Sequence, residues 1–330
     1  MKILITGAAG QIGSGLAKLL IKKNHQLVLV DNLRNGHKTN LISKNKLIAP
    51  FVKVDITTQD FFDTCSQHYD CIIHLAAITS LPDCENNPYE TISINVGGTS
   101  NVLEFARRNN IPHVIFASTS AVYENSNAEI FTEDLEINPT LYYCLSKKMA
   151  EDLVNSYREN YNLKVTTLRF FNVFGPDGDH TRLHPPLINF LVREFKKGIS
   201  PQLSGDGTQT RDFIWVNDVV SMLDICLDKQ PNDTFNVCTG QVISVNQMGQ
   251  WVAESLECEH IGLSYKPPQE LWSRYPQLFD GGYPLNKEVV STETTRPSKG
   301  SYQKAKDLLG WEPNLDIESL VKKVAKEIVI

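Results

Sequence analysis

The chain has 330 residues, of which 41% are hydrophobic and 21% charged, and its formal net charge is −6. Its length suits one large domain or two that share a cleft, and its composition is that of a globular protein. No basic run stands out, so a nucleic-acid partner is not expected. No apolar stretch reaches about 18 residues, and the N-terminal apolar run is too short for a signal peptide, so we expect neither a membrane span nor secretion.

Cysteine and histidine give no sign of a disulfide framework or a metal centre. The seven cysteines are scattered and form no Cys-x-x-Cys pair. Such thiols are typical of a reduced, cytoplasmic compartment. His180 and His184 stand four residues apart in a proline- and glycine-rich segment, with no carboxylate or cysteine at ligand spacing. We therefore expect no metal site.

The beginning of the chain predicts a strand, a glycine loop and a helix. Residues 2–6 are an aliphatic run, Gly7, Gly10 and Gly13 follow at three-residue spacing, and residues 16–21 are amphipathic. In dinucleotide-binding folds the first glycine permits a tight turn, the second lets the backbone approach a pyrophosphate, and the third lets the helix pack closely on the strand. The pyrophosphate would lie at the helix N-terminus, where unpaired N–H groups favour negative charge.

An acid follows the next predicted strand. The aliphatic run 27–30 ends at Asp31, about where this fold places a carboxylate against the ribose hydroxyls of the adenosine. A carboxylate there repels a 2′-phosphate, so we expect NAD and not NADP. Arg34 and Lys38 could serve such a phosphate, but Asp31 would oppose them.

The same alternation continues to about residue 170. Helices are expected over about 58–68 and 88–109, between further apolar strands. Nearly continuous apolar strands separated by helices indicate a buried parallel sheet with helices on both faces. The strands are expected at 51–54, at 71–77 including an exit loop, at 113–117 and at 165–170.

The pattern changes after residue 170, where turn-rich segments begin. We expect an α/β fold: a Rossmann-type doubly wound parallel sheet with a smaller, interleaved C-terminal α/β lobe, and a ligand cleft at the carboxyl ends of the strands. Residues 1–170 would bind NAD, and residues 212–240 would rejoin that domain through strands at 212–216 and 234–238. Residues 171–211 and 241–330 would form the lobe, with helices at about 186–197, 244–256, 301–310 and 316–329.

Tyr143 and Lys147 are four residues apart in the stretch that runs from Pro139 to Glu151. In a helix, residues at this spacing share a face. A lysine ammonium beside a phenol favours the phenolate, so we expect Lys147 to lower the pKa of Tyr143 and to prepare it for acid–base work on a sugar hydroxyl. Such a pair alone is more often a solvated helix face.

Further motifs follow one another in a recognisable order and extend over nearly the whole chain. The chain resembles the extended short-chain dehydrogenase/reductase family, in particular its NAD-dependent nucleotide-sugar epimerases and dehydratases, the UDP-glucose 4-epimerases among them. The resemblance is carried by Gly7-x-x-Gly10-x-x-Gly13, Asp31-Asn32-Leu33-x-Asn35-Gly36, Asp55-Ile56, His74-Leu75-Ala76-Ala77, Asn95, Ser118-Thr119-x-x-Val122-Tyr123, Tyr143-x-x-x-Lys147, Arg169-x-Phe171-Asn172-Val173-x-Gly175-Pro176, Arg211-Asp212-Phe213-Ile214-x-Val216-x-Asp218-Val219 and Leu309-Gly310-Trp311-x-Pro313.

The resemblance implies a role for each matching residue. Tyr143 would be the acid/base, Lys147 would bind the nicotinamide ribose and lower the pKa of the tyrosine, and Thr119 would hydrogen-bond the reacting sugar oxygen, although Ser118 and Ser120 flank it. Substrate would be bound by Thr119, Tyr143, Asn172, Arg211 and Arg296, of which the last three would hold its diphosphate. The cofactor would be bound by Gly7, Gly10, Gln11, Ile12, Gly13, Asp31, Asn32, Leu33, Asn35, Gly36, Asp55, Ile56, Leu75, Ala76, Ala77, Asn95, Ser118, Tyr143, Lys147 and Phe171.

The residue two positions after Thr119 bears on the reaction. Dehydratases and decarboxylases of the family carry a carboxylate there, whereas this chain has Ala121, which cannot move a proton. We therefore expect an epimerase acting at C4 of a UDP-hexose through a 4-keto intermediate. The alternatives are an NAD(P)H-dependent keto-sugar reductase, a 4,6-dehydratase, and a non-catalytic dinucleotide sensor. Family members usually dimerise through two helices, which match about 88–109 and 143–161 here, so a homodimer is expected.

The chain departs from the family pattern at three places. Glu124 stands where glycine is common, and Pro297-Ser298-Lys299 follows Arg296 where Gly-Asp often follows, so the register at Arg296 is open. The segment 267–293 is unusually long and rich in aromatic residues and proline. We expect it to pack on the C-terminal lobe and to border the cleft, the alternative being a surface extension that buries its own aromatics.

Overall fold

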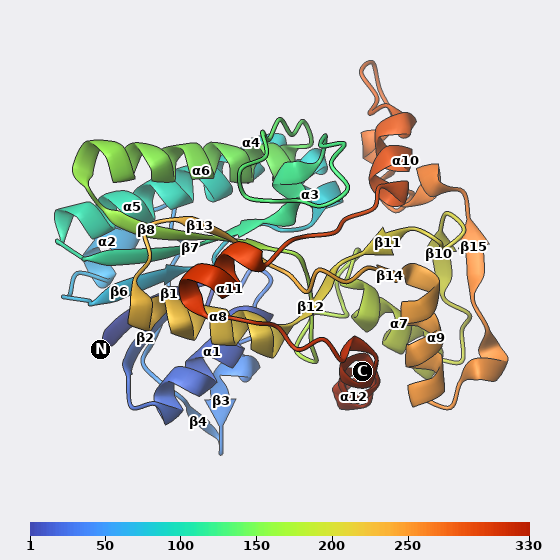
Figure 1. The fold of residues 1–330 in the computed structure, drawn as a ribbon, viewed down its shortest axis with the longest axis horizontal. Helices are drawn as coiled ribbons and strands as arrows, with labels where there is room; N and C mark the ends of the chain where they lie inside the picture. The colour runs from blue at the N-terminus through green and yellow to red at the C-terminus, as the bar shows by residue number, and fades with distance from the viewer.

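Seven parallel strands form the central sheet (Figure 1). The chain builds this sheet outward from β1, first through β2 and β5 on one side and then through β6, β7, β8 and β13 on the other. The direction reverses between β1 and β6, so their carboxyl ends open a crevice in which doubly wound folds bind ligands. The computed structural model describes residues 1–330, and across the sheet the strands are β13 (Thr234–Val237), β8 (Lys164–Phe170), β7 (His113–Thr119), β6 (Cys71–His74), β1 (Lys2–Thr6), β2 (Gln26–Asp31) and β5 (Phe51–Lys53).

Alternate residues of the strands face two separate helical layers. Ile3 and Ile5 belong to one buried cluster, which includes residues of α1 (Gln11–Lys22), α8 (Val216–Lys229) and α11 (Gln303–Leu309). Leu4, between them, belongs to the cluster on the other face, which α2 (Gln59–Thr64), α5 (Thr99–Arg108) and α6 (Tyr142–Tyr161) complete. Because successive side chains of a strand point to opposite faces, one apolar strand contributes side chains to the core on both faces of the sheet. This arrangement confirms the expected Rossmann-type α/β fold.

The C-terminal lobe has its own core. Its buried cluster joins α7 (Leu187–Lys196), α9 (Val245–Ser255) and α12 (Ile317–Glu327). Four short strand pairs form outside the main sheet. They are β9 (Asn172–Phe174) with β12 (Phe213–Trp215), β10 (Gln202–Ser204) with β15 (Ser264–Lys266), β11 (Thr210–Arg211) with β14 (Ile243–Ser244), and β3 (Ile42–Ser43) with β4 (Lys46–Leu47).

One expected strand pairing is different in the structure. Residues 234–238 do rejoin the main sheet, as β13 beside β8, but residues 212–216 do not. They form β12, which pairs in parallel with β9, just beyond the end of β8. The chain returns to the sheet through α8, a helix that was not predicted from the sequence and whose apolar side packs against α1.

A fourth cluster lies beside the start of α6. It contains residues of α3 (Leu81–Asn86) and α10 (Lys287–Thr295) and of the aromatic segment before α10. The helix expected over 88–109 is present as α4 (Pro88–Ile92) and α5, joined by one wider turn at Ser93–Gly98. All seven cysteines are free. None of the helices is both long enough and apolar enough to cross a membrane.

Candidate active site

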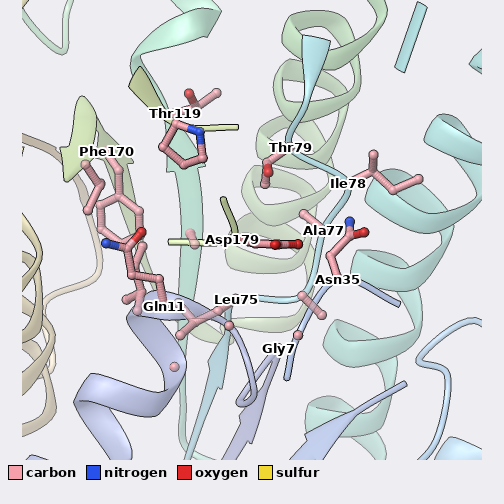
Figure 2. Close-up of a pocket in the computed structure, with 18 of the residues that line it drawn as sticks. Gly7, Gln11, Asn35, Leu75, Ala77, Ile78, Thr79, Thr119, Phe170 and Asp179 are labelled. Atoms are coloured by element: carbon pink, nitrogen blue, oxygen red, sulfur yellow. The ribbon is translucent and has the colours of Figure 1, made fainter. Parts of the chain in front are cut away.

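A cavity of about 480 Å³ opens at the carboxyl ends of β1, β6 and β7. Figure 2 shows Gly7 and Gln11 at one part of its wall and Thr119 at another. The cavity runs from the glycine loop, past the end of β7, to residues 293–298 of the C-terminal lobe. Twenty-two of the residues predicted to bind or react line it: Gly7, Gly10, Gln11, Ile12, Gly13, Asp31, Asn32, Asn35, Gly36, Asp55, Ile56, Leu75, Ala76, Ala77, Ser118, Thr119, Tyr143, Lys147, Phe171, Asn172, Arg211 and Arg296.

The glycine loop is packed too tightly for side chains at two of its positions. Gly7 has a φ of +69°, and a Cβ there would lie 2.7 Å from the nitrogen of Ala76. A Cβ on Gly13 would lie 2.4 Å from the carbonyl oxygen of Gly7. At Gly10 the nearest atom would be 3.4 Å away, so the backbone there is open to the cavity. The loop therefore holds the start of α1 against β1 and leaves Gly10 free for the approach of a pyrophosphate.

The N-terminus of α1 offers donors to this end of the cavity. No side chain caps the helix, which begins at Gln11, so its first N–H groups have no partner within the helix. The buried Nε2 atom of Gln11 also makes no hydrogen bond. Together these groups fit an anion such as a dinucleotide pyrophosphate.

Asp31, at the end of β2, is held by two backbone groups. Its Oδ2 atom accepts a hydrogen bond from the N–H of Ala9 at 3.0 Å, and its Oδ1 atom accepts one from the N–H of Leu33 at 2.7 Å. Burial raises the pKa of Asp31, and the two N–H groups oppose this shift. The carboxylate lines the cavity with lone pairs left for ribose hydroxyls, as the NAD prediction requires.

Two residues predicted to bind the cofactor do not line the cavity. Leu33 has a φ of +62°, and it contributes only its N–H, to Asp31. Asn95 is buried behind the exit loop of β6, where its amide bonds both the N–H and the carbonyl of Ile78, at 2.8 Å and 3.0 Å, and also Ser146. Ile78 does line the cavity. Asn95 therefore acts on the loop and not on the cavity directly.

The three predicted catalytic residues meet where β7 ends and α6 begins. Thr119 and Tyr143 both line the cavity, and the Thr119 side chain opposes the rise in the pKa of Tyr143 that burial causes. Lys147 is one turn further along α6, and its Nζ atom donates to the carbonyl of Ala117 at 2.7 Å. Ser118 also reaches the cavity wall, but its hydroxyl donates to Glu151 at 2.5 Å. The Thr119 side chain accepts a hydrogen bond only from the N–H of Ala121, and its bond to the reacting sugar oxygen stays a prediction.

Burial shifts the pKa of both Tyr143 and Lys147. Burial raises the pKa of Tyr143, and the influences that oppose this shift are the Thr119 hydroxyl and the charge of Arg182. Burial also lowers the pKa of Lys147 to about 8, although Glu151 opposes this shift. In this structure the lysine is bonded to the backbone, and its effect on the pKa of the phenol stays a prediction.

Two carboxylates fix the start of α6. Glu124 accepts hydrogen bonds from the N–H groups of Thr140 and Leu141, at 2.8 Å and 3.0 Å, and one from the Thr140 hydroxyl at 3.0 Å. Glu85 accepts one from the N–H of Tyr142 at 2.5 Å. The unusual acid at position 124 thus satisfies backbone donors just before the helix that carries Tyr143.

The far end of the cavity contains the predicted diphosphate residues. Arg211 donates to main-chain carbonyls of Glu293, Thr294 and Arg296 and thereby braces that segment. Arg296 donates from Nη2 to Glu293 at 3.0 Å, while its buried Nε and Nη1 atoms have no partner. Arg296, whose register was open in the sequence, is therefore the guanidinium with free donors for a phosphate.

The segment 267–293 lies behind the reacting residues. Trp272 and Tyr275 are buried in one cluster with Tyr143 and Ile78, and Glu293 lines the cavity. None of residues 267–292 lines the cavity. The aromatics of the segment pack beside α3 and the start of α6. The segment also contacts the lobe, as expected, through β10 and through the bond from Arg274 to Leu183.

The sequence reasoning missed several residues of the cavity wall. Asp179 lines the cavity, and its Oδ1 atom is 3.6 Å from Nε2 of His37. Arg182 follows it in the same loop between β9 and α7. Its only signal in the sequence was an arginine in a proline- and glycine-rich segment. Others, which the sequence analysis did not name, are Ala9, Val30, His37, Asn40, Val54, Ile78, Thr79, Leu81, Ile94, Ala117, Phe170, Asp177, Gly178, Pro186 and Glu293.

Comparison with known proteins agrees with this geometry. The NAD dependent epimerase/dehydratase family matches residues 3–238. The chain belongs to this family. It is 30% identical to the UDP-glucuronate 4-epimerase of Thermodesulfobacterium geofontis over 97% of this chain and 94% of that protein. It is 29% identical to the UDP-glucose 4-epimerase of Mycolicibacterium smegmatis over 99% of this chain and 97% of that protein.

The solved structures give the same result. The crystal structure of the UDP-glucose 4-epimerase of Thermotoga maritima with UDP-glucose is 28% identical and has a TM-score of 0.86, covering 99% of this chain and 98% of that one. The family is NAD-dependent, and the residues of this chain fit NAD: an open Gly10, unpaired donors at Gln11 and an acid at Asp31. NAD is therefore the cofactor.

Proposed function

We propose that this protein epimerises a UDP-hexose at C4 through a transient 4-keto sugar. The observation that carries the proposal is that Thr119 and Tyr143 line one cavity together with the residues that fit NAD and with Arg296. A sugar whose diphosphate is bound by Arg296 would therefore present its hexose to Tyr143.

The chain's own residues divide the chemistry. Tyr143, as phenolate, takes the proton from the C4 hydroxyl and returns it at the end of the cycle. Thr119 donates to the same oxygen and helps to hold C4 in position. A bound NAD, held at Gly10, Gln11 and Asp31, would supply the acceptor and the donor for the hydride at C4. Arg296 and Asn172 keep the diphosphate in place while the hexose turns.

Because burial raises the pKa of Tyr143, the phenolate needs positive charge nearby at neutral pH. The Arg182 guanidinium already opposes the shift, and Lys147 is one helical turn away. Ala121 lines the cavity where a dehydratase would need a carboxylate, which favours epimerisation over dehydration.

The test is incubation of the purified protein with single UDP-hexoses, followed by NMR of the product in deuterated water. We expect the same mixture of C4 epimers from either starting sugar, without net change in NADH and without deuterium at C5. Stoichiometric consumption of NAD(P)H would instead identify a reductase, and deuterium at C5 with loss of the C6 hydroxyl would identify a 4,6-dehydratase. No turnover of any nucleotide sugar would favour a dinucleotide sensor.

We also propose that the protein is a cytoplasmic homodimer, by analogy with its family. The helices α5 and α6 lie side by side on the outside of the sheet (Figure 1). Met149 and Tyr161 of α6 and Tyr89 of α4 are exposed apolar side chains on this side. Sedimentation at micromolar concentration should give a mass of two chains, and a monomer would refute the dimer.

A further inference from the structure

Arg182 is a cation at the cavity wall whose donors are free. It lines the cavity from the loop between β9 and α7. Its guanidinium donates no hydrogen bond, and the buried Nη2 atom has no partner. The nearest acid is Asp83, whose Oδ2 atom is 3.7 Å from Nη2. That distance allows charge attraction but is too long for a hydrogen bond.

Asp83 is held by another residue. Its Oδ1 atom accepts a hydrogen bond from the Tyr275 hydroxyl at 2.6 Å. Tyr275 is 4% exposed and packs in the cluster that contains Trp272 and Tyr143. Asp83 cannot turn fully toward Arg182 without breaking this bond. The aromatic segment before α10 therefore keeps Asp83 in place through Tyr275. The N–H groups of the Arg182 guanidinium stay available to a ligand in the cavity.

Arg182 lies close to the reacting group. Its positive charge opposes the rise in the pKa of Tyr143 that burial causes. Ile78, Leu81, Thr79 and Ala121, which also line the cavity, carry no charge. Asp179, in the same loop as Arg182, is 3.6 Å from His37. Arg182 is also separate from the diphosphate arginine, because Arg296 is paired with Glu293. The end of the cavity that receives the hexose therefore contains a cation that the diphosphate does not use.

We infer that Arg182 binds a carboxylate carried by the hexose, so that the substrate class is a nucleotide-linked sugar acid. This inference rests on the proposed function for the placement of the hexose beside Tyr143. The planar fork of a guanidinium matches a carboxylate with two parallel hydrogen bonds. A neutral hexose would leave several of the five N–H donors of Arg182 in a desolvated site without acceptors, which is unfavourable.

Binding without turnover tests the inference. In Tyr143→Phe holoenzyme, calorimetry would compare UDP-glucuronate with UDP-glucose, which differ only in a carboxylate or a hydroxymethyl group at C5. We expect UDP-glucuronate to bind at least about 10-fold more tightly. Adding Arg182→Met should remove this preference, weakening UDP-glucuronate by roughly 10- to 100-fold while UDP-glucose changes little.

Two further variants serve as controls. Arg182→Lys keeps the charge without the fork, so its preference for the acid should be intermediate. Arg274→Met removes an arginine that donates only to the carbonyl of Leu183 in the same loop, at 3.4 Å, and that does not line the cavity. It should leave the preference unchanged. If both methionine variants lost the preference for UDP-glucuronate equally, the cause would be the general loss of a positive charge, and the role of Arg182 would be overturned.

Equal or tighter binding of UDP-glucose would also overturn the inference, as would equal weakening of both ligands by Arg182→Met. Turnover separates this failure from a failure of the proposed function. Wild-type protein that epimerises UDP-glucose without preference for the acid retains the function and refutes the inference. A binding preference for UDP-glucuronate with no epimerisation of either sugar supports the site and refutes the function.

Discussion

The Nζ atom of Lys147 lies 2.7 Å from the carbonyl oxygen of Ala117, so the lysine one turn beyond Tyr143 is bonded to the end of β7. Burial lowers the pKa of this ammonium to about 8, from an ordinary value of 10.5. Between these two values the unfolded chain binds more protons than the folded one, so folding stability should rise with pH in that window. Below pH 8 both states are protonated, and above 10.5 both are neutral.

Urea unfolding at constant NAD can isolate this effect. Lys147→Met has no such proton, so wild type should gain stability relative to the variant by about 3 kcal/mol between pH 8 and 10.5. The absolute difference at pH 7 also contains the lost bond to Ala117, and only its change with pH tests the buried ammonium. If the free energy of unfolding changed with pH in the same way in both proteins, Lys147 would not be held in a desolvated site.

Removal of the Tyr143 hydroxyl should stop turnover and leave the cofactor in place. We expect Tyr143→Phe to lower kcat by roughly 10²- to 10⁴-fold, the usual contribution of a positioned acid or base. The NAD content of the purified protein should not change, because the ring still packs in its apolar cluster. Tyr142→Phe is the matched control, since Tyr142 does not line the cavity. More than a tenth of wild-type activity in Tyr143→Phe would exclude the assigned role.

Asp31 should make the protein selective for NAD. Arg34, the nearest candidate for a 2′-phosphate, is already paired with Glu90, with an Nη2–Oε2 distance of 2.9 Å. We therefore expect NADP to bind at least about 10-fold more weakly than NAD, and Asp31→Asn to narrow the difference because it removes a charge at close range. Calorimetry measures both affinities. Equal binding of the two cofactors by wild type would contradict this assignment.

The parts of the site that depend on local sequence were predictable. Gly7 and Gly13 have no space for a side chain, and this requirement follows from a tight strand-to-helix turn wherever it occurs. Tyr143 and Lys147 share a helix face because of their spacing alone. The strand periodicity likewise indicated the doubly wound sheet.

The parts that depend on contacts between distant segments were not predictable. Arg211 and Arg296 both matched a phosphate role, and only the fold shows that Arg211 bonds to the main chain while Arg296 keeps free donors. Asn95 matched a cofactor motif, but it bonds to the backbone of Ile78. The importance of Arg182 depends on Asp83 and Tyr275, which are far from it in the chain.

Glu124 should position Tyr143 through the start of α6. Loss of its three hydrogen bonds in Glu124→Ala should cost about 1–2 kcal/mol of stability, as for a helix cap, and should lower kcat several-fold. A glutamine can accept the two N–H bonds and donate to the Thr140 hydroxyl, so Glu124→Gln should stay near wild type in both. Thermal unfolding and steady-state kinetics measure these effects. If the glutamine variant lost as much stability and kcat as the alanine variant, the charge of Glu124 and not its hydrogen-bond geometry would matter.

Trp272 should support the active site without binding substrate. It is 1% exposed, packs in the cluster that contains Tyr143 and Leu141, and does not line the cavity. Trp272→Ala should destabilise the fold by about 3–5 kcal/mol, because a large cavity remains in a buried cluster. Since that cavity lies behind Tyr143, kcat should fall more than KM rises. Tyr283→Ala, in the same segment but with a fully exposed side chain, should change neither stability nor kinetics. A rise in KM at unchanged kcat in Trp272→Ala would instead mean that the segment contacts the nucleotide sugar.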